Sequence, residues 1–175
     1  MTQKPHSNAA MRTAMESARK YLIENRAEAR YTDSFARAKV EEGLKVRVEG
    51  PGGESLVTDM PAGVGGGGEA PSPGWYWRAA VAACVTSLAV MRAAQLEIDG
   101  FACEVEVDSE SDDYGILDLD PSVPAGPISM RISIQVSAKA AGTAQLTELA
   151  NWAVNHCPVS EAIRRAIPTV VEVNS

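Results

Sequence analysis

Two cysteines of this chain lie in sequence settings that suit thiol redox chemistry. Cys84 sits inside an apolar run of small residues from Ala79 to Met91, which is expected to be helical. Cys157 follows an amphipathic segment and directly precedes Pro158, a residue type favoured in the first turn of a helix. If the two thiols face each other, one thiolate can attack a peroxide oxygen and the other can resolve the resulting sulfenic acid.

The surroundings of the two thiols predict different acidities. An apolar helix interior raises the pKa of a thiol, so a thiolate at Cys84 needs a stabilising partner. If Pro158 is the first residue of a helix, Cys157 is its N-cap and the helix dipole favours a thiolate there. His156 could add positive charge beside it, although an exposed neutral histidine is the more ordinary interpretation.

The third cysteine, Cys103, is expected to be a small residue of the core. It falls on the apolar face of an alternating segment, with Phe101, Val105 and Val107 on the same side. An odd number of cysteines leaves at least one thiol without an intramolecular partner.

The chain alternates helical and extended patterns. Helical spacing of apolar residues predicts helices, and alternation of apolar with polar residues predicts strands. The expected helices cover 9–27, 75–98, 144–156 and 159–167; the expected strands lie within 35–60 and at 101–108, 128–136 and 169–173; glycine- and proline-rich or acidic loops fill 61–74 and 109–127. Antiparallel strands with inserted helices define an α+β fold.

Composition narrows the possible partners. The net charge is −7 and the sequence pI about 4.9, and no basic stripe is present to neutralise phosphates. Nucleic acid and anionic membrane surfaces are therefore not expected partners. The apolar run 79–91 is too short to cross a bilayer, and the N-terminus shows no apolar signal segment. Three cysteines in such a chain indicate free thiols or redox chemistry, so we expect a cytoplasmic protein.

Other chemistries lack their motifs. The histidines and cysteines do not show zinc spacing, and no metal or cofactor is expected. The glycine run 65–68 lacks the Lys-Ser/Thr pair of a phosphate-binding loop. Ser87 and Ser160 have no Gly-x-Ser-x-Gly context, and the acidic run 108–113 lacks the calcium-loop pattern.

The order of these elements resembles the OsmC/Ohr family of organic-hydroperoxide reductases and osmotically induced proteins. The resemblance covers roughly residues 35–173 and depends on two motifs, Ala79 to Cys84 and His156 to Ser160. Residues 1–34 are then an N-terminal helical extension, and residues 35–175 the OsmC-like domain.

The resemblance implies a fold, a partner and a reaction. The fold is an intertwined homodimer with antiparallel sheets wrapped around two central helices. In that family the first cysteine is the peroxidatic thiol and the second resolves it, and Cys84 and Cys157 match those positions. The implied activity reduces organic hydroperoxides through a Cys84 sulfenic acid and a Cys84–Cys157 disulfide. A cellular dithiol then reduces the disulfide, and no metal, haem or flavin is needed.

One departure from the family pattern leaves a second function open. The resemblance implies an arginine that supports the first thiolate, and Arg37 is the best candidate, with Arg30 second. Peroxidases of this family carry a Pro-Glu pair before the first cysteine, and its glutamate holds that arginine. Here the matching place reads Pro73-Gly74, and Glu69 is shifted. The alternative is a non-catalytic protein of the same fold that binds a small apolar ligand in a stress response.

Overall fold

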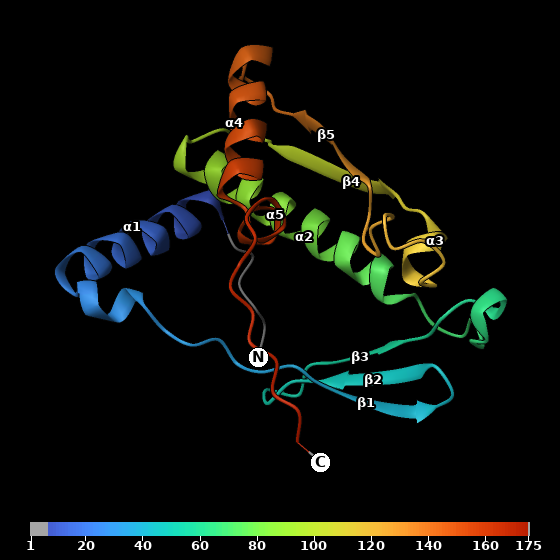
Figure 1. Ribbon diagram of the computed structural model, residues 1–175. Coiled ribbons are helices and arrows are strands. Elements are labelled where there is room, and N and C mark those ends of the chain that lie inside the picture. The colour runs from blue at the N-terminus through green and yellow to red at the C-terminus, as the bar shows by residue number, and fades with distance from the viewer. Residues whose placement is uncertain (1–6, 175) are drawn as a thin grey trace. The chain divides into compact units, whose positions relative to one another are not determined.

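The computed structural model describes residues 7–174 of the chain (Figure 1). It combines helices with two antiparallel sheets, as expected for an α+β fold. The elements in chain order are α1 (Asn8–Glu24), the 3-10 turn η1 (Arg26–Ala29), β1 (Arg37–Glu42), β2 (Lys45–Glu49), β3 (Ser55–Thr58), the 3-10 turn η2 (Ala62–Val64), α2 (Pro73–Gln95), β4 (Ala102–Glu110), α3 (Asp113–Ile116), β5 (Ser129–Ser137), α4 (Thr143–His156) and α5 (Pro158–Arg164).

The chain divides into two compact units, which we describe separately. The thiol unit contains the described residues up to Ala14 and those from Ala80 onward. The sheet unit runs from Met15 to Ala79. The boundary that we expect between residues 34 and 35 stays a prediction.

The sheet unit contains a three-stranded antiparallel sheet in the order β1-β2-β3. The turn between β1 and β2 places Gly43 at a φ of 55°, a conformation that costs little for glycine. The predicted turn at Pro51-Gly52-Gly53 joins β2 to β3, and Val48 pairs with Leu56 across it. The alternation at Val46 and Val48 therefore predicted this sheet correctly.

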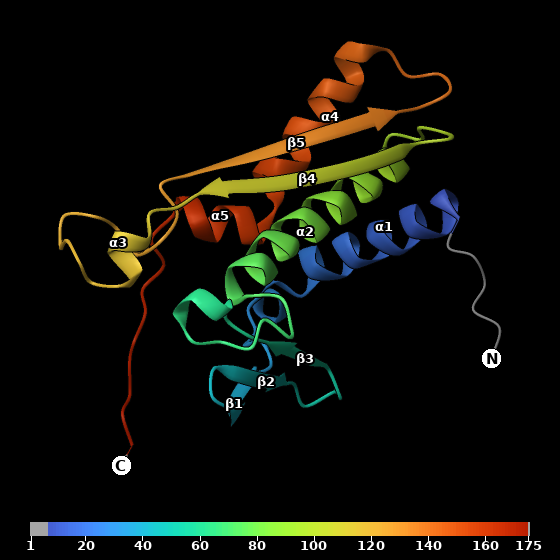
Figure 2. The same cartoon turned by 90° about the vertical axis from the view of Figure 1, so that its right-hand side faces the viewer.

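The thiol unit contains the β4–β5 hairpin and the helices that pack against it. The two strands pair in continuous register from Ala102 opposite Ser137 to Glu110 opposite Ser129. Cys103, Val105 and Val107 lie on the face that packs against the core, as the alternation predicts. Figure 2 shows the hairpin running alongside α2.

The core of the thiol unit consists of small and medium apolar side chains. Alanine and valine on α2 let neighbouring elements approach closely, and the burial of apolar surface supplies the main driving force. The core residues buried from solvent are Val81, Val85, Ala89, Ala93, Ile98, Leu149, Ala153 and Cys157. One thiol of interest, Cys157, is thus a member of the core itself.

Helix α1 contacts the thiol unit at its first turns. The Asn8 side chain donates a hydrogen bond to the Ile98 carbonyl over 3.3 Å, and Arg12 forms an ion pair with Glu97. The residues that directly follow α2 therefore hold the start of the N-terminal helix.

Two expectations about the later part of the chain are wrong. Residues 169–173 form no strand, and the side chains of Val170, Val171 and Val173 are 81–88% exposed. β-branched residues favour a strand, but a strand also needs a hydrogen-bonded neighbour, and no described segment pairs with this one. The acidic loop 109–127 contains the one-turn helix α3, whose N-cap Asp112 accepts a hydrogen bond from the Tyr114 N–H over 2.9 Å.

Helix α2 is longer than the apolar run 79–91 inside it. Its 23 residues are long and apolar enough to cross a membrane by length and composition alone. That evidence is weak, because core helices pass the same test, and Val81, Val85 and Ala89 of α2 are buried in the core of the thiol unit.

Candidate thiol redox site

Cys84 lies in the middle of α2 and packs against the core of the thiol unit. The helix forms here because alanine has the highest helix propensity and the run contains no glycine or proline after Gly74. Val81 and Val85 on either side of Cys84 are fully buried, whereas Cys84 itself is half-buried. The Cys84 sulfur therefore lies at the edge of the core.

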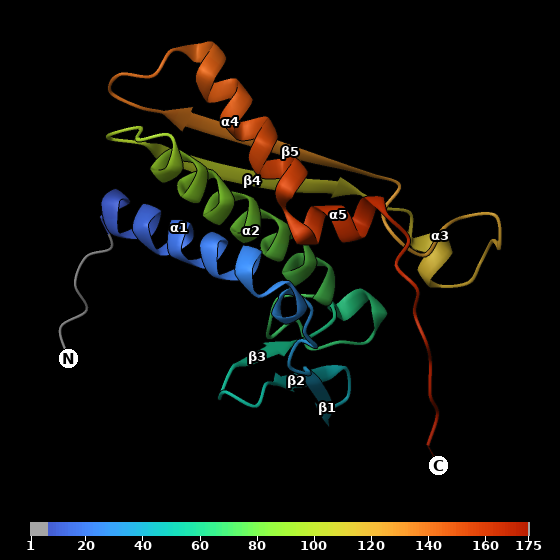
Figure 3. The ribbon, with the colours of Figure 1, turned by 90° about the vertical axis from the view of Figure 1, so that its left-hand side faces the viewer.

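Cys157 lies at the junction of α4 and α5, where the chain changes direction (Figure 3). Helix α4 ends at His156, and Pro158 is the first residue of α5, so Cys157 is the N-cap of α5 as the sequence predicts. Its sulfur accepts a hydrogen bond from the Ser160 N–H over 3.3 Å. The Cys157 side chain is fully buried.

The two thiols are neighbours, close enough for each to shift the pKa of the other. This contact brings together residues 73 positions apart, because α2 and α4 share one core. Burial, followed by the neighbouring Cys157 side chain, raises the pKa of the Cys84 thiol above its ordinary value, and the Val159 N–H offsets part of this rise. The direction of this shift agrees with the expected effect of an apolar helix on a thiol, and the need of a Cys84 thiolate for a stabilising partner stays a prediction.

The pKa of Cys157 moves in the opposite direction. Burial alone would raise it, but the Ser160 side chain and N–H, the neighbouring Cys84 and the Val159 N–H outweigh burial and lower the pKa. The opposite directions of the two pKa shifts favour the negative charge of the pair on Cys157. Cys84 is the more exposed of the two cysteines. The more accessible thiol, Cys84, is therefore not the more acidic one, Cys157.

Aromatic and cationic side chains stack beside the junction of α4 and α5. The His156 ring stacks on Trp152 with 4.1 Å between ring centroids, and its Nδ1 lies 2.8 Å from the Trp152 carbonyl oxygen. The Arg92 guanidinium lies over the Trp152 ring, 4.8 Å from its centroid. His156 is exposed, and its ring packs on Trp152.

Cys103 takes no part in the thiol pair. It lies on β4, half-buried, where it packs against the core. Burial raises the pKa of its thiol, and no other cause contributes. This is the expected setting of a small core residue.

The candidate arginines lie in the sheet unit. Arg37 is exposed at the start of β1, with its guanidinium 4.9 Å from the centroid of the Phe35 ring. Arg30 is the C-cap of the turn η1. The part of either arginine in supporting Cys84 stays a prediction.

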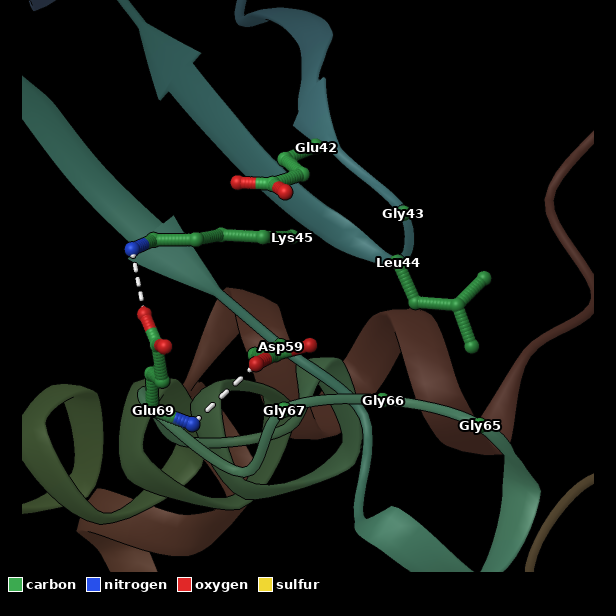
Figure 4. Close-up of a pocket in the computed structure, with 9 residues that line it drawn as sticks. All are labelled: Glu42, Gly43, Leu44, Lys45, Asp59, Gly65, Gly66, Gly67 and Glu69. Carbon is green, nitrogen blue, oxygen red and sulfur yellow. Dashed lines mark hydrogen bonds and ion pairs between the residues drawn. The ribbon is translucent and has the colours of Figure 1, made fainter.

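A charged pocket of about 300 Å³ lies within the sheet unit, between the β1–β2 turn and the glycine-rich loop (Figure 4). Lys45 points toward Glu69, and their side chains form an ion pair of 2.7 Å. The shifted glutamate therefore pairs with a lysine of its own unit. The pocket is lined by Glu42, Gly43, Leu44, Lys45, Asp59, Gly65, Gly66, Gly67 and Glu69. Three carboxylates against one ammonium group disfavour an anionic ligand.

Asp59 anchors the glycine-rich loop of this pocket. Its carboxylate accepts hydrogen bonds from the Glu69 N–H over 3.1 Å and from the Met60 N–H over 2.7 Å. The Glu69 N–H is the main cause that lowers the pKa of Asp59, and the Met60 N–H lowers it further. Desolvation offsets part of this lowering. A Cβ at Gly66 would lie 1.8 Å from the Met60 carbonyl oxygen, so only glycine permits this close turn.

No metal site is found in residues 7–174. Within that range, no group of three His, Cys, Asp or Glu side chains is arranged to hold an ion. The three cysteines are free thiols.

The family comparison covers the part of the chain that contains the thiol pair. The OsmC-like protein family matches residues 66–172, which include Cys84, Cys157 and Ser160. The match covers more than half of the chain, and the chain belongs to the OsmC-like protein family. No curated protein matches the sequence.

Solved structures of the same family share the fold. An OsmC-like protein from Mycoplasma pneumoniae has a TM-score of 0.65 at 12% identity, with 78% of this chain and 91% of that chain covered. An organic hydroperoxide resistance protein OsmC from Legionella pneumophila has a TM-score of 0.56 at 22% identity and covers 77% and 91%. The organic hydroperoxide resistance protein OhrB of Bacillus subtilis has a TM-score of 0.51 at 22% identity and covers 77% and 93%.

Sequence reasoning did not assign a role to Ser160 beside the thiol pair. Its side chain is 2% exposed. Its hydroxyl oxygen is buried and has no hydrogen-bond partner among residues 7–174. The signal was present in the spacing, because the third residue after an N-cap donates its N–H to the capping side chain. A Cys-Pro-x-Ser pattern at a helix start therefore places a hydroxyl residue beside the sulfur.

Proposed function

We propose that this protein is a thiol-dependent peroxidase that reduces organic hydroperoxides through Cys84 and Cys157. The observation that carries the proposal is the juxtaposition of the two thiols, with Cys157 in the core and Cys84 packed against it. Two relatives of the same fold are named organic hydroperoxide resistance proteins, which supports the choice of substrate.

Cys84 is the attacking residue in this proposal, because a peroxide oxygen must reach the sulfur. Cys84 is half-buried, whereas Cys157 is fully buried. The Cys157 thiolate lies beside the Cys84 thiol and can accept its proton. Because the pKa of Cys84 is the higher of the two, only a minority of the resting pair carries the charge on Cys84, and attack proceeds from that form.

The reaction proceeds in two steps. The Cys84 thiolate attacks the terminal oxygen of the hydroperoxide, the O–O bond breaks, and the alkoxide takes up a proton to leave as an alcohol. Cys84 is now a sulfenic acid. The Cys157 thiolate attacks the Cys84 sulfur, a disulfide forms, and the hydroxide that leaves takes up a proton to become water. A cellular dithiol returns the disulfide to two thiols.

The proposal includes assembly and location. We place the protein in the cytoplasm, where thiols are kept reduced, as an intertwined homodimer. The exposed valines of the C-terminal segment and the fully exposed strand β1 support a second copy as partner, because such segments gain most from pairing. Sedimentation should give about twice the chain mass of 18.5 kDa at micromolar concentration. A folded monomer would contradict this architecture.

The test of the activity is the consumption of an organic hydroperoxide, such as cumene hydroperoxide, in the presence of dithiothreitol. Cys84→Ser should abolish the first turnover. Cys157→Ser should keep one turnover and then accumulate sulfinic acid under excess peroxide. Cys103→Ala is the matched control and should turn over like the native protein. Equal single-turnover rates in the native protein and Cys84→Ser would refute the proposal.

One observation favours the alternative, a non-catalytic protein that binds a small apolar ligand. Position 74 lacks the family glutamate, and Glu69 is already paired with Lys45. An organised carboxylate for a supporting arginine is thus missing at the family position. Native protein that consumes no hydroperoxide, with both thiols still titratable, would favour this second function.

A further inference from the structure

The buried Ser160 hydroxyl is the polar group beside the thiol pair that the reaction above does not use. Ser160 is 2% exposed, and its Oγ has no hydrogen-bond partner among residues 7–174, although the side chain lies close enough to Cys157 to lower the pKa of that thiol. A buried hydroxyl without a partner costs free energy unless a group in the site uses it. The adjacent Ser160 N–H already donates to the Cys157 sulfur over 3.3 Å, so both donors of this residue lie on the side of the sulfur.

We propose that Ser160 is a positioning residue that donates its hydroxyl to the Cys157 sulfur and makes Cys157 the leaving group when a dithiol opens the Cys84–Cys157 disulfide. The inference rests on the proposed function, because it concerns the recovery half of that cycle. Its geometric basis is the orphaned hydroxyl, the Ser160 N–H contact and the full burial of Cys157.

The direction of the exchange follows from exposure. A thiolate of the dithiol reaches the Cys84 sulfur, which is half-buried, and not the Cys157 sulfur, which is fully buried. A bond forms between the reductant and Cys84 while the Cys84–Cys157 bond breaks, and the electron pair stays on Cys157. The reductant's second thiol then attacks the reductant sulfur of the mixed disulfide and releases Cys84. The dithiol ends as a cyclic disulfide, and the two cysteines take up its two protons.

The stabilisation of the leaving thiolate depends on few groups. Leu149 and Ala153 belong to the same core cluster as Cys157, Cys84 packs against that cluster, and none of the three carries a charge while Cys84 is held in the mixed disulfide. Besides Ser160, the Val159 N–H also lowers the pKa of Cys157. His156 is turned onto Trp152, and Glu161 is paired with Arg165 over 3.1 Å. A leaving group of lower pKa leaves faster in thiol–disulfide exchange, so loss of one donor should slow the opening of the disulfide.

The experiment compares Ser160→Ala with the native protein, both carrying Cys103→Ala. The disulfide is formed with diamide, so the test does not depend on peroxidase activity. Its reduction by dithiothreitol should slow about threefold or more in Ser160→Ala. Loss of a hydrogen bond to a charged acceptor changes the acid dissociation constant of the leaving thiol by roughly tenfold, and the logarithm of the exchange rate changes by about half as much as the logarithm of that constant. Ser87→Ala, whose hydroxyl bonds to the Ala83 carbonyl over 2.9 Å, should keep the native rate.

A second readout separates positioning from mere packing. With Cys157 as the single cysteine, in a Cys84→Ser and Cys103→Ala background, thiolate absorbance at 240 nm reports its titration. Ser160→Ala should raise the pKa of Cys157, and Ser160→Thr, which keeps the hydroxyl, should restore it. An unchanged titration and reduction rate in Ser160→Ala, or a Thr variant that behaves like Ala, would overturn the inference. If Ser160→Ala changes the titration of Cys157 and the reduction rate as expected, but the native protein consumes no hydroperoxide, the proposed peroxidase activity is wrong and the role of Ser160 stands.

Discussion

Leu149 is the side chain whose removal should cost most stability among the simple truncations. It is 1% exposed on α4 and packs in the core cluster that contains Ala153 and Cys157. Leucine-to-alanine changes in cores cost about 2–5 kcal/mol in free energy of unfolding, and the cost depends on how far the neighbours fill the cavity. Many neighbours here are alanines, such as Ala89 and Ala93, which have no side-chain rotamers with which to fill it.

We therefore expect Leu149→Ala to lose about 3–5 kcal/mol of unfolding free energy, in the upper half of that range. For a chain of this size, each kcal/mol lowers the melting temperature by roughly 2–4 °C, so the melting temperature should fall by about 6–20 °C. Urea unfolding followed by circular dichroism measures the free energy, and a thermal scan measures the temperature.

The matched control is Leu119→Ala, a leucine that is 61% exposed. Exposed substitutions of this kind usually stay within about 0.5 kcal/mol of the native protein. A loss below about 1 kcal/mol for Leu149→Ala, or equal losses for the two variants, would refute the assignment of α4 to the core. Since α4 ends beside Cys157, a large loss should also disturb the thiol pair.

Three further predictions test other parts of the molecule. Cys103→Val should leave hydroperoxide turnover unchanged and alter stability by about 1 kcal/mol, since it is a small change at a half-buried core position; lost turnover in a folded variant would mean that the thiol pair is assigned wrongly. In the folded state, the Glu69 N–H is the main cause that holds the pKa of Asp59 below its ordinary value of 3.8. The charged Asp59 therefore stabilises the fold above pH 3.8, and this stabilisation is lost as the pH falls through the lower folded pKa. Acid unfolding of Asp59→Asn should therefore be less steep than that of the native protein, and parallel profiles would contradict the hydrogen-bonding argument. Gly74→Glu should be tolerated, because a Cβ there meets nothing closer than 3.8 Å. The change should stabilise the first turn of α2 by about 0.5–1 kcal/mol relative to glycine, measured by urea unfolding. A destabilised variant would indicate a steric demand for glycine at this position.

The elements that place the thiols were predictable because their patterns are local. Strand alternation at 101–108 and 128–136 and helical spacing at 144–156 follow from how side chains point along a strand or a helix. The N-cap position of Cys157 followed from Pro158 in the same way, because proline fits the first position of a helix. The glycine-rich stretch 61–74 was correctly expected to contain a loop, although not its short turn η2.

The tertiary structure alone decided what depends on distant parts of the chain. Residues 169–173 have the composition of a strand but no described neighbour to pair with, because pairing is not a local property. The contact between Cys84 and Cys157 follows from the packing of α2 with α4, and the order of their pKa values follows from donors that no spacing reveals in full. The sequence by itself predicted which two thiols form the pair. The fold determined that Cys84 is the less buried of the two and that Ser160 lies buried beside Cys157, because burial and hydrogen bonding are set only when the elements pack.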